Sequence, residues 1–159
     1  MEQFLTQNSD IILKLTLAIG LGMIIGAERT FVHKEAGMKT HALVSMGSAL
    51  FVMVSEFMVQ TYIHLPGLNP TMIPAQIIVG IGFLGAGAIM LQGSKVKGLT
   101  TAGGLWVTAA IGMASGFGLF ALAIISAVLV LFIFIVLNII EEPLRTLAGK
   151  DPYEEKIES

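Results

Sequence analysis

Long apolar runs dominate the chain, and charged residues fall almost entirely in short segments between them. From Thr40 to Ser94 the one formal charge is Glu56, and from Gly98 to Ile140 there is none. A soluble domain needs a polar face on each surface helix, and a membrane barrel strand alternates polar and apolar positions. Neither pattern is present here, so the sequence predicts an all-α membrane protein.

Five of these runs are long enough to cross a membrane, which takes roughly 17–25 apolar residues in a helix. We expect transmembrane helices at about residues 11–27, 41–63, 73–91, 99–116 and 119–140. Together they form one transmembrane domain over residues 1–140. Residues 141–159 are charged, and they predict a short cytoplasmic tail.

Basic residues mark the loops that we expect on the cytoplasmic side. Arg29, Lys34 and Lys39 follow the first span, and Lys95 and Lys97 follow the third. The links after the second and fourth spans carry no formal charge. Because Lys and Arg in short loops favour the cytoplasm, the sequence predicts an external N-terminus and a cytoplasmic C-terminus.

Composition narrows the possible chemistry. Only 13% of the residues are charged and the net charge is −2, which gives no support for nucleic-acid binding. The chain has no cysteine, which excludes disulfides, thiol nucleophiles and thiolate metal sites. Paired carboxylates, a nucleophile beside a base, and metal-binding motifs are also missing from the sequence. We therefore expect neither an enzyme nor a resident metal or cofactor.

Two glycine motifs recur along the chain and suggest an internal repeat. Gly20–Ile24 matches Gly80–Leu84, and Gly37–Thr40 matches Gly98–Thr101. The offsets of 60 and 61 residues differ by a single insertion. Spans one and two would then be related to spans three and four as parallel hairpins, with span five added. The alternative is chance similarity between glycine-rich apolar segments.

Several longer strings carry a family resemblance. They are Ile25–Arg29 (IGAER), Ala36–Val44 (AGMKTHALV), Ala75–Ile89 (AQIIVGIGFLGAGAI) and Val96–Gly112 (VKGLTTAGGLWVTAAIG). In this order they resemble the MgtC/SapB family of bacterial inner-membrane proteins. The resemblance covers most of the chain, and it matches the short form of the family, without the ACT-like C-terminal domain of longer members.

The resemblance implies a multi-pass protein of the bacterial inner membrane, tied to growth at low magnesium and, in pathogens, to virulence. It does not imply one settled activity, since both magnesium transport and modulation of other membrane machinery have been attached to the family. Our first hypothesis is a non-enzymatic regulator or accessory that binds other membrane proteins. The alternative is a small transporter of Mg²⁺ or another cation. A homo-oligomer, such as a homodimer, is compatible with either.

Small residues recur at helical spacing in several spans. Gly80-x-Gly82-x-x-Gly85 fits a dinucleotide-binding pattern, but it lies inside an apolar span and not between a strand and a helix. Small residues in membrane helices let backbones approach closely. We therefore predict helix packing, within the subunit for spans one and three, at Gly22, Gly26, Gly82, Gly85, Gly112 and Gly116.

Polar residues within the spans have two readings. Glu56 is either a proton or cation site or the partner of Lys14, which itself follows Asp10 by one helical turn. Thr108 belongs to a polar stripe that faces protein or a wet cavity, and Trp106 lies too deep for the membrane interface, so that its indole N–H needs a buried acceptor. A wet cavity lined by Thr101, Thr108 and Glu56 would favour transport, and a solid, glycine-packed bundle would favour the accessory role.

A polar layer is expected at the cytoplasmic ends of the helices. By the repeat, the N-termini of spans two and four lie at one depth, and helix N-termini favour anions. The layer binds either an anionic ligand or simply anchors the helices to acidic lipids. Its candidate residues are Glu28, Arg29, Lys39, Thr40, Thr100 and Thr101. Gln76, near the outer start of span three, is a separate candidate binding residue, or it is simply interfacial.

Overall fold

A computed structural model describes residues 8–62, 69 and 71–147. These residues form five helices and one short antiparallel hairpin of two strands. The elements are α2 (Ser9–Phe31), α3 (Met38–Tyr62), α4 (Met72–Ala88), β1 (Met90–Gln92), β2 (Lys95–Lys97), α5 (Leu99–Gly116) and α6 (Phe120–Leu147).

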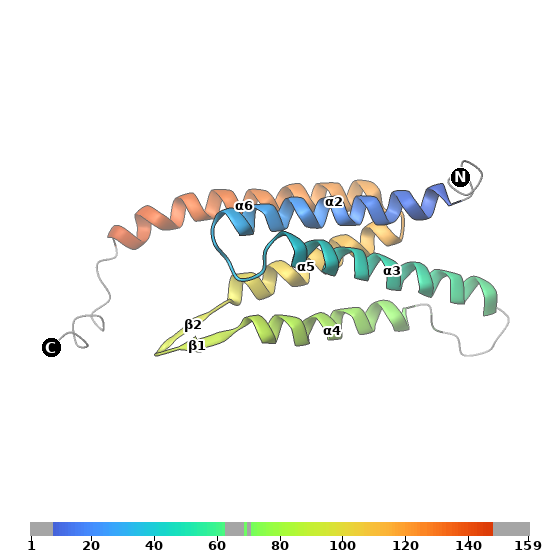
Figure 1. The fold of residues 1–159 in the computed structure, drawn as a ribbon, viewed down its shortest axis with the longest axis horizontal. Coiled ribbons are helices and arrows are strands. Elements are labelled where there is room, and N and C mark those ends of the chain that lie inside the picture. The colour runs from blue at the N-terminus through green and yellow to red at the C-terminus, as the bar shows by residue number, and fades with distance from the viewer. Residues whose placement is uncertain (1–7, 63–68, 70, 148–159) are drawn as a thin grey trace.

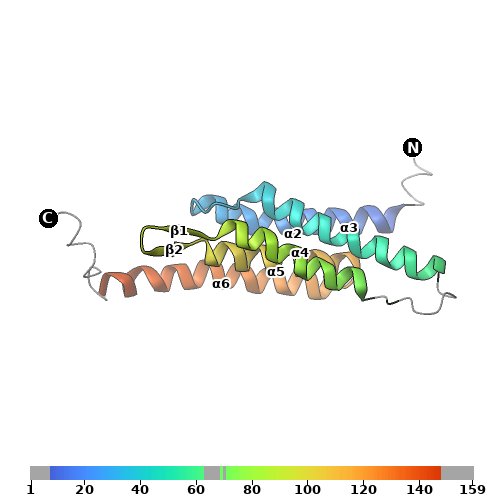
Figure 2. The same cartoon turned by 90° about the horizontal axis from the view of Figure 1, so that it is seen from below.

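The helices form an elongated bundle around α5, which packs against each of the other four. Figure 1 shows α2 and α6 side by side along one edge of the bundle and α4 along the opposite edge. The described start of α2 and the end of α6 lie at opposite ends of the bundle (Figures 1 and 2). The α2–α3 loop, the β-hairpin and the end of α6 gather at one end, which we call the basic end because Arg29, Lys34, Lys95 and Lys97 lie there.

The surface of this bundle differs from that of a soluble protein, while its core is mostly apolar. Large apolar side chains cover the surface; Phe83, for example, is 81% exposed. The buried positions include eight polar or charged residues. These are Arg29, His41, Ser45, Ser48, Ser55, Thr101, Thr108 and Ser115. Such a surface is favourable when lipid surrounds it, and the buried polar groups then need partners inside the bundle.

Three of the described helices are long and apolar enough to cross a membrane by length and composition. They are Ser9–Phe31, Met38–Tyr62 and the Phe120–Glu141 part of α6. Helix α4 is apolar but has only 17 residues, and α5 is not among the three. Five helices lie near the five expected runs, whereas five membrane crossings remain a prediction.

The chain after α4 differs from the expected apolar run, because the helix ends at Ala88, short of residue 91. Ile89 is extended, and the two strands pair Met90 with Lys97 and Gln92 with Lys95. Gly98 then starts α5 with a φ of 88°, in the left-handed region that glycine enters without strain. A Cβ at Gly98 would clash with the Ala88 carbonyl oxygen, so the hairpin closes tightly on the end of α4.

Candidate functional site

Arg29 is the one charged residue buried among the described core residues. It lies in the last turn of α2, is 3% exposed, and its Nε donates a hydrogen bond to the Glu28 carboxylate. Its guanidinium carbon lies 3.6 Å from the centroid of the Phe134 ring in α6. The ion pair and the cation–π contact fix the guanidinium plane at the basic end of the bundle.

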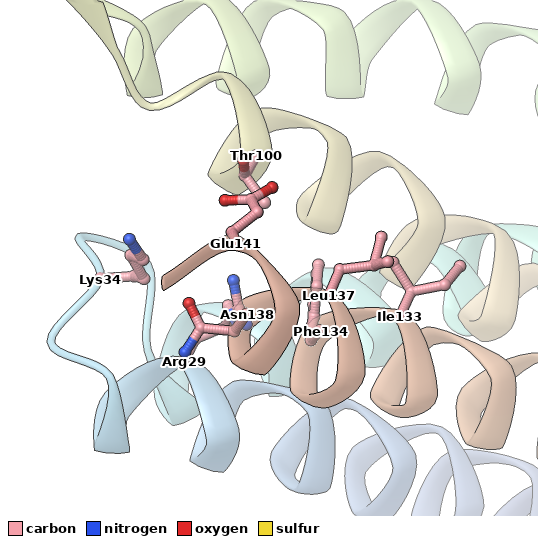
Figure 3. Close-up of a pocket in the computed structure, with 8 residues that line it drawn as sticks. All are labelled: Arg29, Lys34, Thr100, Ile133, Phe134, Leu137, Asn138 and Glu141. Atoms are coloured by element: carbon pink, nitrogen blue, oxygen red, sulfur yellow. The ribbon is translucent and has the colours of Figure 1, made fainter. Parts of the chain in front are cut away.

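A pocket of about 420 Å³ opens beside this arginine. Its lining side chains come from α2, the α2–α3 loop, α5 and α6, as Figure 3 shows. They are Arg29, Lys34, Thr100, Ile133, Phe134, Leu137, Asn138 and Glu141. The pocket therefore joins two cationic side chains, a hydroxyl, an amide and a carboxylate to the apolar flank of α6.

The structure places the residues of the predicted polar layer at more than one site. Arg29 and Thr100 share the pocket, and Glu28 is joined to it through Arg29. Thr101 turns away and donates a hydrogen bond of 3.1 Å to Glu35. Thr40 and Glu35 line a second pocket of about 470 Å³ between the α2–α3 loop, the first turn of α3, α4 and α5.

Two other predicted binding residues lie elsewhere. Lys39 is exposed in the first turn of α3 and lines neither of these two pockets. Gln76 lines a groove of about 820 Å³ between α3 and α4, whose walls are almost entirely apolar. Lys39 therefore shares no described pocket with Arg29 or Thr40, and Gln76 lines a separate groove. A binding role for these two residues stays a prediction.

Glu35 has a role that the sequence did not reveal. It lies in the α2–α3 loop, and its pKa is lowered from the ordinary value, first by a hydrogen bond from its own backbone N–H and then by the bond from Thr101. Both bonds stabilise the ionised carboxylate. Glu35 thus ties the loop after α2 to the start of α5.

His41 stands behind the pocket, fully buried near the start of α3. Its Nδ1 lies 3.1 Å from the Gly37 carbonyl oxygen, and its Nε2 has no hydrogen-bond partner within the described residues. A Cβ placed on Gly104 would lie 3.6 Å from that nitrogen and 3.0 Å from Cζ of Phe134. His41, Gly104 and Phe134 are thus packed together, and Phe134 is the residue whose ring contacts the Arg29 guanidinium.

Glu56 has the geometry of an ion pair at the opposite end of the bundle. Lys14 Nζ lies 3.6 Å from a Glu56 carboxylate oxygen and 3.1 Å from an Asp10 oxygen. The Lys14 side chain is 14% exposed, and the Glu56 side chain is 35% exposed. A carboxylate held in this way fits the ion-pair interpretation of the sequence better than a free cation site.

Two buried hydroxyl groups of α5, those of Thr108 and Ser115, donate hydrogen bonds within their own helix. Thr108 donates to the Gly104 carbonyl at 2.8 Å, and Ser115 donates to the Ile111 carbonyl at 3.0 Å. The expected burial of Trp106 is wrong, because it is 51% exposed. It shares the uncovered face of α5 with Gly103 and Ala110, which are also exposed.

The predicted packing glycines fall into two groups. A Cβ would lie 2.6 Å from the His41 carbonyl oxygen at Gly22, 2.6 Å from the Met38 Cα at Gly26 and 2.7 Å from the Ala49 carbonyl oxygen at Gly116. At Gly112 it would clash with the Ser45 carbonyl oxygen. At these four positions the helix backbones approach each other directly.

Helix α4 lacks such contacts. A Cβ at Gly85 would be in ordinary contact with Ala102, at 3.6 Å. Nothing in the described chain lies within 4 Å of a Cβ at Gly82, so the expected close contact within the subunit is absent there. The reason is position. Helix α4 lies along the edge of the bundle (Figure 1), and Gly82 is exposed.

The site offers no evident metal centre. Among the described residues, no group of three His, Asp or Glu side chains is placed to hold a metal ion. Mg²⁺ in proteins is usually bound by one or two carboxylates together with water or substrate phosphate.

The fold, with its apolar surface and long apolar helices, is that of a helical membrane protein. A family model described as the MgtC family matches residues 15–143, and the chain belongs to this family. No solved structure matches the chain.

Three relatives show the extent of the similarity. The chain is 43% identical over 128 residues to YhiD of Escherichia coli (strain K12), whose name provisionally assigns it to magnesium transport; the match covers 79% of this chain and 60% of YhiD. It is 45% identical over 120 residues to protein MgtC of Salmonella typhimurium (strain LT2), covering 76% and 49%. Protein slr0014 of Synechocystis is 42% identical over 144 residues, covering 91% and 57%. The chain thus spans about half to three-fifths of the length of these relatives.

Proposed function

We propose that this protein is a non-enzymatic accessory of other machinery in the bacterial inner membrane, acting during growth at low magnesium. The observation that carries the proposal is the backbone contact between Gly112 in α5 and Ser45 in α3. This contact, with the one between Gly116 and Ala49, closes the centre of the bundle where a transport path would run.

The polar residues support the same proposal. Thr108 is bonded within α5, and Glu56 is held by Lys14. None of the three pockets described above is lined by Thr101, Thr108 or Glu56. A wet path through the bundle would need such side chains to face a common cavity.

The exposed small residues of α3 and α4 give the accessory a surface for contact. Nothing in the described chain lies within 4 Å of a Cβ at Gly47, Gly80 or Gly82. Gly47 and Gly80 line the apolar groove between the two helices. Small residues allow the helices of another membrane protein to approach closely.

The name of YhiD supports a second candidate, transport of Mg²⁺ by this chain. A flux assay separates the two functions. Protein reconstituted into liposomes should give no protein-dependent Mg²⁺ flux, while the intact gene should restore growth of a deletion strain at low magnesium. Protein-dependent flux that Glu56→Gln removes would overturn the accessory function in favour of transport.

The contact surface has its own test. Gly80→Leu and Gly82→Leu should impair growth at low magnesium at normal protein levels, because the large side chains block a partner helix. Ala121→Leu, on the exposed side of α6, is the matched control and should be silent. Normal growth of both glycine variants would exclude this face of α4 as the working surface.

The proposal includes five membrane crossings, with the N-terminus outside and the basic end of the bundle in the cytoplasm. The absence of cysteine makes the labelling test clean. Cysteines introduced at Asn69 and Ser94 should react with an impermeant reagent from opposite sides of the membrane. Reaction of both from outside would reject this topology.

A further inference from the structure

The pocket beside Arg29 is amphiphilic along its length. Toward the end of α6 its wall carries Asn138 and Glu141, and toward the middle of the bundle it carries Ile133 and Leu137. Residues 133 and 141 are separated by about 12 Å along a helix that rises 1.5 Å per residue. One side of the pocket is therefore polar, while the other follows the apolar flank of α6.

Arg29 places a buried cation with spare donors at the polar side. A guanidinium has five N–H donors, and the hydrogen bond described for Arg29 uses the one on Nε. Phe134 covers one face of the group and Glu28 occupies one edge. The terminal nitrogens form the part of a buried arginine that can serve a ligand in the pocket.

Other donors surround the same space. Lys34, an exposed residue of the α2–α3 loop, and Thr100, in the first turn of α5, line the pocket with Arg29 (Figure 3). Gly98 caps α5 without a side-chain hydrogen bond, so the first N–H groups of this helix add positive potential. Two cations, a hydroxyl and a helix N-terminus are suited to a phosphate group.

The apolar half of the pocket indicates where such a phosphate comes from. Ile133 and Leu137 line it and are each 48% exposed on the outer surface of α6. A free phosphate ion gains nothing from this apolar wall, whereas an acyl chain beside it removes apolar surface from contact with water and headgroups.

We propose that this pocket binds the phosphate group of an anionic membrane phospholipid, with Arg29 and Lys34 as its donors and the acyl chain against Ile133 and Leu137. Glu141 stands at the rim and is already engaged in an interaction of its own. The positive charges of Arg29, from α2, and Lys34, from the α2–α3 loop, attract the negative charge of the lipid phosphate.

Binding can be measured with the whole purified chain in a neutral detergent. The probes are a short-chain phosphatidylglycerol, inorganic phosphate and a diacylglycerol with the same chains but no phosphate. Each is titrated while the midpoint of thermal unfolding is followed by helical circular dichroism. Phosphatidylglycerol should raise the midpoint with saturation, inorganic phosphate should do so only at far higher concentration, and diacylglycerol should not.

Three variants test the donors. Lys34→Ala, at an exposed position, should fold normally and weaken phosphatidylglycerol binding by about tenfold, the usual effect of a lost charge-assisted hydrogen bond. Arg29→Lys should keep the charge but lose most binding, because the fork of donors is gone. Lys39→Ala removes the same charge from an exposed residue outside the pocket and should bind as the unaltered protein does.

The apolar half has a variant of its own. Leu137→Trp should weaken phosphatidylglycerol binding and leave inorganic phosphate binding unchanged, because only the chain occupies that wall. Equal stabilisation by inorganic phosphate and phosphatidylglycerol would overturn the lipid as the source of the phosphate. Equal losses in Lys34→Ala and Lys39→Ala, or no saturable effect of either phosphate probe, would overturn the site itself.

Discussion

The α2–α3 and α4–α5 hairpins share glycine motifs in sequence but differ in how they pack. In the first, Gly22 and Gly26 bring the helix backbones together, with a Cβ distance of 2.6 Å at each. In the second, Gly82 stands where the repeat places Gly22, yet nothing in the described chain lies within 4 Å of its Cβ position.

The difference follows from the position of each hairpin in the bundle. Helix α2 is covered by α3, α5 and α6, whereas α4 packs chiefly against α5 and less closely against α3. A repeated motif therefore preserves the capacity for close contact, and the surrounding helices decide whether that contact is made within the chain. On α4 the glycines that could make such contacts, Gly80 and Gly82, lie on the outer surface of the bundle.

The largest effect should come from exchanging the equivalent glycines. Gly22→Leu forces a side chain into the backbone of α3 and should cost more than ~3 kcal/mol of unfolding free energy, the upper part of the overpacking range. Gly82→Leu should change it by less than about 0.5 kcal/mol. Thermal unfolding in detergent measures both, and a similar loss in the two variants would mean that α4 is packed like α2.

Gly112→Leu belongs to the same class of severe changes, since it acts where the two hairpins meet. The Ser45 carbonyl oxygen occupies the space that any side chain at Gly112 would need. Folded yield after purification should fall sharply, with the adjacent half-buried position, Met113, as the control. For that control, Met113→Leu keeps the volume and should retain the yield.

The turns of the two hairpins should differ by a smaller amount. In Gly98→Ala, the alanine must adopt a left-handed backbone, and its Cβ clashes with the Ala88 carbonyl oxygen. We therefore expect the free energy of unfolding to fall by about 2–3 kcal/mol. Gly37, its counterpart, has room limited only by the Thr30 hydroxyl, and Gly37→Ala should cost about 1 kcal/mol. Chemical unfolding midpoints compare the two, and an inverted order would reject the described turn.

The ion pair of the first hairpin has no counterpart in the second. At the offsets of the repeat, Pro74 and Phe117 replace Lys14 and Glu56. A double-mutant cycle with Lys14→Met and Glu56→Gln should give a coupling of about 0.5–1 kcal/mol, since Glu56 is partly exposed. Additive effects of the two changes would show that the charges do not interact.

The smallest expected effect is a change in the pKa of Glu35, which accepts a hydrogen bond from Thr101 across the two hairpins. Thr101→Val removes one donor to Glu35, so the pKa of that carboxyl should rise toward its ordinary value. Because the folded protein lowers this pKa, the stabilisation is present at neutral pH and is lost as the pH falls through the folded value. NMR titration of the glutamate carboxyl resonances measures the shift, and an unchanged pKa would rule out the bond in solution.

The sequence predicted the bundle well where a single signal dominated. Apolar runs located the five helices, because a span must be apolar along most of its length. The expected and observed ends agree to within four residues except at the end of α6, which continues seven residues past residue 140 to Leu147, into the charged segment. The run through residue 91 hid the β-hairpin, since Met90 and Leu91 are as apolar as the helix before them. Gly93 and Gly98 around Lys95–Lys97 were the available signal for a turn.

The site was predictable only in part. Arg29 and Thr100 could be placed at one end from charge pattern and helix starts, and the pocket holds both. Phe134 and Asn138 could not, because they lie in a long span whose sequence gives no sign of which face meets α2. Whether a side chain faces lipid or a pocket depends on helix rotation, which neighbouring helices determine.

The central position of α5 has a consequence for how the protein is made. It contacts all four other helices and buries Thr101, Thr108 and Ser115, yet it is not among the three helices apolar enough to be candidate spans on their own. During synthesis such a segment gains little from entering lipid alone. We therefore expect α5 to depend on its contacts with α2, α3, α4 and α6 for a stable place in the membrane, which it would reach only as the bundle assembles.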